Sequence, residues 1–151
     1  MSTASAAQSQ VVPPQAINFT VPDPKRTNNL SLPLYHGAGF NTEYKAWQLL
    51  VPGGFMQFNL ELPEDQNIRL TLDECSMNVD GKSNNPYTIT VNHNYTLITN
   101  FDDHGDHFHE VSFLITKQWL HAGANSIVIK LDSSATTKVS FKSVGVAGIV
   151  G

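Results

Sequence analysis

Residues 101–131 decide the fold, and they read FDDHGDHFHEVSFLITKQWLHAGANSIVIKL. The second half predicts a strand, a short crossing segment at residues 118–120, a turn marked by Gly123 and Asn125, and a further strand. In that last strand the apolar residues of IVIKL recur at every second position, which is typical of one buried face. The first ten residues hold four acidic side chains and three of the six histidines of the chain, so they are the best candidate for chemistry.

Other parts of the chain alternate in the same way and predict an all-β protein. We expect strands at residues 16–21, 55–62, 68–72, 87–91, 95–98, 108–115, 127–131 and 139–150. Residues 31–40 and 44–51 stay ambiguous. A polar turn joins residues 55–62 to 68–72, and this predicts a hairpin.

Eight or so short strands favour a single antiparallel β-sandwich of jelly-roll type. We expect this domain at residues 15–151, after a disordered leader at residues 1–14. The predicted core consists of Leu70, Leu72, Ile89, Phe113, Ile115, Ile127, Ile129 and Leu131.

Composition narrows the functional classes. The 151 residues fit one domain, and only 15% are charged. Residues 61–110 hold ten acidic side chains against Arg69 and Lys82, a local net charge of −8 (two minus ten), which argues against a nucleic-acid partner. No apolar segment approaches the length of a membrane span, so we expect no membrane partner. The opening MSTASAAQSQ has no signal-peptide pattern, which makes the cytoplasm the default expectation. The lone Cys75 favours a core thiol.

The motifs between residues 87 and 131 resemble the galactose-binding-like β-sandwich domains of beta-galactosidases, beta-glucuronidases and many carbohydrate-binding modules. The matching residues are Val91-Asn92, Trp119-Leu120, Gly123, Asn125 and the strand at residues 127–131. We expect Asn92 at a tight hairpin, where its side chain can bond the backbone, Gly123 in a turn where it permits a positive φ, and Asn125 bonded to the turn backbone. His93 departs from the pattern, because glycine is common there.

The resemblance implies a sugar ligand. Aromatic rings stack on the apolar face of a pyranose, and planar polar groups bond its hydroxyls. We expect ligand contacts from Trp47, Tyr44, His36, Asn92, Tyr95 and His104, with Tyr35 and Phe101 as further candidate platforms. Trp119 lies within the fold motif and is expected in the core, and Trp47 has a competing interpretation as a core residue.

A metal ion is a second expectation for the stretch at residues 101–110. Closely spaced carboxylates suit calcium, and many galactose-binding-like domains hold a structural calcium ion. The calcium ligands would be Asp102, Asp103 and Asp106. His104, His107 and His109 would instead hold zinc or another transition metal. A solvated acidic turn is the competing interpretation of both sets.

These features favour a non-catalytic, lectin-like carbohydrate-binding module, with residues 101–110 as its functional edge. The first alternative is a small metal-assisted enzyme that uses the same stretch. The second is an assembly domain that binds another protein through a sheet face. The sequence has no Gly-x-Ser-x-Gly and no His-Glu-x-x-His. The oligomeric state stays open.

Overall fold

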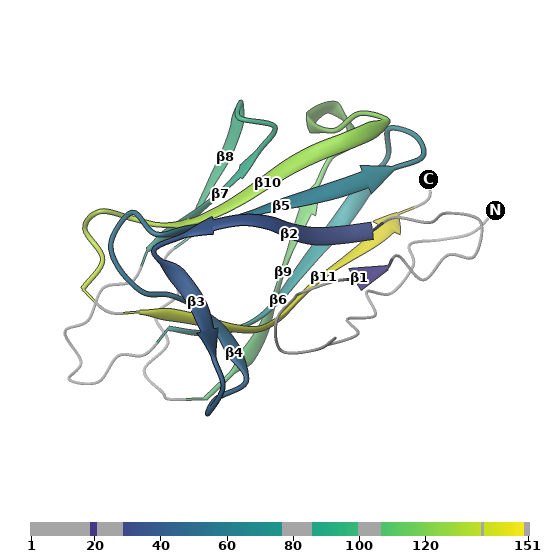
Figure 1. Ribbon diagram of the computed structural model, residues 1–151. Helices are drawn as coiled ribbons and strands as arrows, with labels where there is room; N and C mark the ends of the chain where they lie inside the picture. The colour runs from purple at the N-terminus through teal and green to yellow at the C-terminus, as the bar shows by residue number, and fades with distance from the viewer. Residues whose placement is uncertain (1–18, 21–28, 77–85, 100–106, 137, 150–151) are drawn as a thin grey trace.

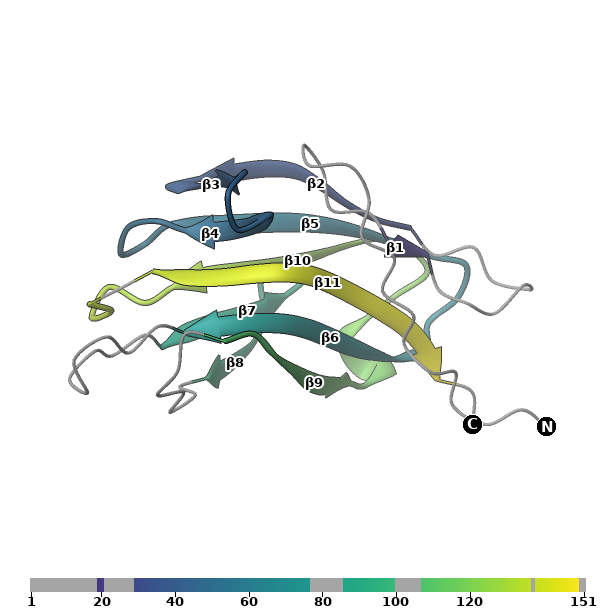
Figure 2. The same ribbon diagram turned by 90° about the horizontal axis from the view of Figure 1, so that it is seen from below.

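The computed structural model describes residues 19–20, 29–76, 86–99, 107–136 and 138–149, and two antiparallel sheets stack in it as a jelly-roll sandwich (Figures 1 and 2). The six-stranded sheet has the order β1 (Phe19–Thr20), β2 (Asn29–His36), β5 (Phe55–Leu62), β10 (Gly123–Leu131), β7 (Tyr87–Val91) and β8 (Tyr95–Thr99). The five-stranded sheet has the order β3 (Ala38–Asn41), β4 (Ala46–Leu49), β11 (Val139–Ile149), β6 (Asn67–Ser76) and β9 (His109–Ile115). The all-β sandwich prediction is confirmed.

The core lies between the two sheets and follows the predicted alternation. Phe58 of β5 lies beside its register partner Ile127 of β10, and both belong to the core. The inward residues of β6 and β11, in the other sheet, belong to the same core. Burial of one face of each sheet is the main apolar contribution to folding. Seven of the eight predicted core residues are buried, and Phe113 is partly buried against the others.

The predicted hairpin between residues 55–62 and 68–72 is wrong. β5 pairs with β2 and β10, whereas β6 pairs with β11 and β9 in the other sheet. The connection after β5 therefore crosses from one sheet to the other. Two alternating strands joined by a polar turn have the same local pattern whether they pair or cross, because each needs only one buried face.

The two ambiguous stretches are strands separated by turns. Residues 31–40 contain most of β2 and β3, with Gly37 between them at a φ of 64°, and residues 44–51 contain β4. Near Trp119 the chain forms the 3₁₀ turn η1 (Lys117–Trp119). In the part of the chain that the structure describes, no helix has the length and apolar character needed to span a membrane.

Two asparagines tie the turn after β7 to the start of β10. Nδ2 of Asn92 donates to the Trp119 carbonyl at 2.8 Å and to Oδ1 of Asn125 at 2.9 Å. Oδ1 of Asn92 accepts from the Ser126 amide at 2.9 Å. Asn92 lies at a φ of 50° and His93 at 64°, so both residues of this tight turn adopt the left-handed conformation.

Asn125 is almost fully buried and uses its whole amide. Oδ1 also accepts from the His121 amide at 3.0 Å. Nδ2 lies 2.8 Å from the His121 carbonyl and 3.1 Å from that of Gly123, where φ is 97°. The expectations for Asn92, Gly123 and Asn125 as turn residues are confirmed, and we call the Asn92–Asn125 pair with its partners the amide lock.

We expect Asn125→Ala to lower the free energy of unfolding by about 3 kcal/mol, because several buried amides and carbonyls lose their partner together. Urea denaturation measures this effect. Asn94→Ala is the matched control, since Asn94 is exposed in the same turn, and it should change stability by less than about 0.5 kcal/mol. Equal effects of the two substitutions would contradict the structural role of the lock.

Candidate functional site

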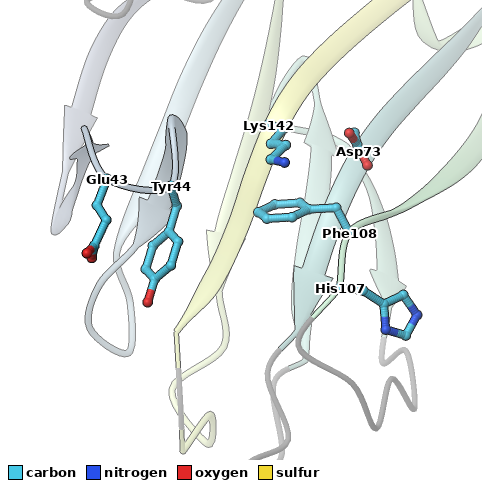
Figure 3. A pocket seen from close by; sticks show the side chains of 6 residues that line it. All are labelled: Glu43, Tyr44, Asp73, His107, Phe108 and Lys142. Atoms are coloured by element: carbon cyan, nitrogen blue, oxygen red, sulfur yellow. The ribbon is translucent and has the colours of Figure 1, made fainter.

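A cleft of about 640 Å³ opens at the end of the five-stranded sheet (Figure 3). Its lining combines two aromatic rings with four polar or charged side chains. These residues are Glu43, Tyr44, Asp73, His107, Phe108 and Lys142. They come from the β3–β4 turn, from β6, from the residues just before β9, and from β11.

The β3–β4 turn presents Tyr44 to solvent. Oδ1 of Asn41 accepts from the amides of Glu43 at 2.9 Å and Tyr44 at 3.0 Å, which forms an Asx turn. Lys45 follows with a φ of 55° and returns the chain into β4. The Tyr44 side chain is 52% exposed. A local hydrogen-bonded turn therefore holds an open aromatic ring at the rim of the cleft.

A β-bulge places Lys142 in the cleft. Phe141 pairs with Glu74 and Ser143 with Asp73, so Lys142 is the extra residue of β11 against β6. A bulge re-aims the side chain of the inserted residue. Nζ of Lys142 lies 4.7 Å from the centroid of the Phe108 ring, a cation–π contact that is visible in Figure 3.

The charges around the cleft are mixed. Glu43 and Asp73 supply carboxylates, Lys142 an ammonium group and His107 an imidazole. Asp73 is also the register partner of Glu110 across β6 and β9. Two carboxylates directly opposite one another repel. Hydrogen-bond donors beside Asp73, from the protein or from a ligand, would therefore be favourable.

The buried carboxylate of Glu74 supports β9, the strand that follows the cleft residues His107 and Phe108. Glu74 is 0% exposed, its Oε1 lies 3.7 Å from Nε2 of His109, and its Oε2 accepts from the Tyr87 hydroxyl at 3.5 Å. Glu74 and His109 are register partners in β6 and β9. A carboxylate inside a core needs such polar partners. The pair therefore fixes the start of β9, from which Phe108 and His107 extend.

We expect Glu74→Ala to destabilise the protein by about 3 kcal/mol, because it removes a partner from the buried Tyr87 hydroxyl and from the partly exposed His109 ring, and leaves a cavity. Chemical denaturation checks this value. Glu110→Ala is the matched control on the exposed side of the neighbouring strand, and it should be neutral or slightly stabilising because it removes the repulsion with Asp73. Neutral behaviour of Glu74→Ala would show that the buried carboxylate does not support β9.

The structure brings two of the predicted site residues, Tyr44 and His107, into the cleft. Trp47 is only 3% exposed and belongs to the core, where the rings of Tyr35 and Phe40 meet it edge-on at 4.9 and 5.9 Å. The Trp47 ring is therefore covered and does not serve as a platform for a ligand. This agrees with the competing interpretation of Trp47 as a core residue.

Three further predicted ligand residues that the structure describes do not line the cleft. Asn92 belongs to the amide lock, where both ends of its side-chain amide are bonded. His36 is exposed at the end of β2, with its ring 6.3 Å from that of Phe55. Tyr95 lies at the start of β8 and stacks on Trp119.

The metal expectation remains a prediction. Asp102, Asp103, His104 and Asp106 lie outside the described residues, as does Phe101. Among the residues that are described, no three His, Cys, Asp or Glu side chains are placed to hold a metal ion. His107 lines the cleft, and His109 faces Glu74 with its ring 6.2 Å from that of His107.

Sequence reasoning missed Glu43, Asp73, Phe108 and Lys142. Lys142 had a usable signal, since it is the only charged residue in the apolar run VSFKSVGVAGIV. The charged pair Asp73-Glu74 likewise interrupts the alternation of β6. No signal in the sequence identified the β3–β4 turn as a neighbour of residues 107 and 108.

Comparisons with known proteins define the class of fold. No protein-family model matches the chain, and no curated protein matches it in sequence. The family 35 carbohydrate-binding module from Clostridium thermocellum shares the fold with a TM-score of 0.57 at 15% identity, over 88% of this chain and 98% of the module. The C-terminal family 6 carbohydrate-binding module of a laminarinase from Zobellia galactanivorans has a TM-score of 0.56 at 9% identity, over 87% and 98%.

The same fold occurs within larger enzymes. A ruminal family 26 endo-beta-1,4-mannanase matches with a TM-score of 0.53 at 20% identity, over 78% of this chain but only 21% of the enzyme. The chain thus spans about a fifth of that enzyme, whereas it spans nearly all of the isolated modules. It shares the β-sandwich fold of these carbohydrate-binding modules.

Proposed function

We propose that the protein is a non-catalytic carbohydrate-binding module that holds its glycan in the cleft beside Tyr44. The observation that carries this proposal is an exposed aromatic ring beside several hydrogen-bonding groups, in a fold that matches isolated carbohydrate-binding modules over nearly their whole length. Sugar recognition requires this combination of a flat apolar surface and polar groups.

Tyr44 is the stacking platform in this proposal. Tyr44 is 52% exposed and the Asx turn holds its backbone, so little backbone entropy is lost when a pyranose covers the ring. Phe108 forms an apolar wall opposite the turn, and the ammonium group of Lys142 lies over one face of that ring. The wall therefore offers a donor group as well as an apolar surface.

The polar groups of the cleft suit sugar hydroxyls, which both donate and accept. Glu43 and Asp73 accept hydrogen bonds, Lys142 donates them, and His107 does either according to its tautomer. Hydroxyl donors next to Asp73 would also relieve its repulsion with Glu110. The hydroxyl groups of a neutral polysaccharide can therefore donate to the carboxylates of the cleft and accept from Lys142 at the same time.

We expect a glycan array to show binding and Tyr44→Ala to weaken it about tenfold, the effect of losing one ring contact of roughly 1.4 kcal/mol. Soluble β-1,4-mannan and laminarin are suitable first ligands for isothermal titration calorimetry. Tyr44→Phe keeps the ring and should retain most of the affinity. Ile98→Ala is a distant control, because Ile98 is 79% exposed on β8 of the other sheet.

Unchanged affinity in Tyr44→Ala would refute the cleft as the sugar site. Failure of the array to detect any glycan, with protein that melts cooperatively, would refute the proposed function itself. In that case a partner protein or a reaction that depends on His107 would become the better hypothesis.

A further inference from the structure

A second aromatic surface lies at the far end of the sandwich from the cleft. The rings of Tyr95 and Trp119 stack with their centroids 4.9 Å apart and their planes at 5° to one another. In Figure 1 the β7–β8 turn and η1, from which these rings come, are at the top, whereas the β3–β4 turn of the cleft is at the bottom.

The order of the two rings leaves one face of Tyr95 toward solvent. Trp119 is partly buried and packs against the core, and Tyr95 covers it. Tyr95 is nevertheless 38% exposed. Since the stack hides one face of the Tyr95 ring, the exposed surface belongs to the opposite face and the ring edge.

The backbone holds this stack rigidly. Asn92 donates to the Trp119 carbonyl at 2.8 Å, so the amide lock joins the two segments that carry the rings. The amide of Lys117 donates to Oδ1 of Asn67 at 2.8 Å, which anchors η1 to the start of β6. Because hydrogen bonds hold the backbone segments that carry the rings, little conformational entropy is lost when a ligand covers the stack.

Exposed polar side chains lie on the same two segments as the rings. His93 and Asn94 precede Tyr95 in the turn, and Lys117 and Gln118 precede Trp119 in η1. An exposed aromatic face with neutral and basic hydrogen-bonding groups beside it matches one ring of a polysaccharide.

We propose that the Tyr95–Trp119 stack is a second sugar platform, so that one molecule holds two glycan segments at opposite ends of the sandwich. This inference rests on the proposed carbohydrate-binding function. Two separate sites would let the protein cross-link polysaccharide chains or gain avidity on a dense surface of them.

Isothermal titration calorimetry with a β-1,4-mannan hexasaccharide and a laminarin hexasaccharide tests the inference. We expect at least one of them to bind the wild-type protein at two per molecule. Tyr44→Ala should weaken one site about tenfold, and Tyr95→Leu should weaken the other by a similar factor. Leucine keeps apolar cover over Trp119 but removes the flat ring. Tyr95→Phe is the matched control and should keep a stoichiometry of two.

The outcomes separate the two proposals. One site in the wild-type protein that is weakened in Tyr44→Ala and unchanged in Tyr95→Leu would overturn the second platform and leave the cleft intact. One site weakened only in Tyr95→Leu would support the platform and overturn the cleft. No binding of either hexasaccharide to folded wild-type protein would overturn both. Thermal melting of each variant verifies that it is folded.

Discussion

The hydrogen bond between Asn92 and Asn125 is the constraint on which the rest of the structure depends. It joins the turn after β7 to the start of β10, and so fixes two strands that carry much of the core. Because Asn92 also bonds the Trp119 backbone, the register of β10 and the position of η1 are set together. A buried amide network specifies one geometry only when all its polar atoms are hydrogen-bonded. Oδ1 and Nδ2 of both Asn92 and Asn125 have hydrogen-bond partners.

The opposite end of the sandwich departs from regular sheet structure, and the cleft arises from those departures. The bulge at Lys142 adds a residue to β11. Glu74 puts a carboxylate where alternation calls for an apolar side chain. The Asx turn at Asn41 projects Tyr44 away from the sheet. Local exceptions to good packing often mark sites that bind ligands.

The sequence predicted the strands and the core well. Apolar residues at every second position show directly which face of a strand is buried. It also predicted the turn roles of Asn92, Gly123 and Asn125, which follow from backbone conformation. It failed on one strand pairing, because the link after β5 looks like a hairpin but crosses between the sheets. The sequence also failed to predict most of the cleft. That site joins four segments that lie far apart in the chain, and a local pattern does not report which distant segments meet.

Trp47 and Trp119 show why burial is harder to predict than secondary structure. Both lie among apolar residues, yet Trp47 is a core residue and Trp119 is only partly buried beneath an exposed ring. The sequence had favoured Trp47 over Trp119 as the exposed ring. Their difference depends on what packs from other strands, which periodicity within one segment does not report.

The most direct measurement is amide chemical-shift mapping of the isotope-labelled protein during titration with mannan and laminarin oligosaccharides. The account predicts the largest changes at the six residues that line the cleft, which are Glu43, Tyr44, Asp73, His107, Phe108 and Lys142. Saturating changes confined to other surfaces of the sandwich, or no changes with either sugar, would contradict it.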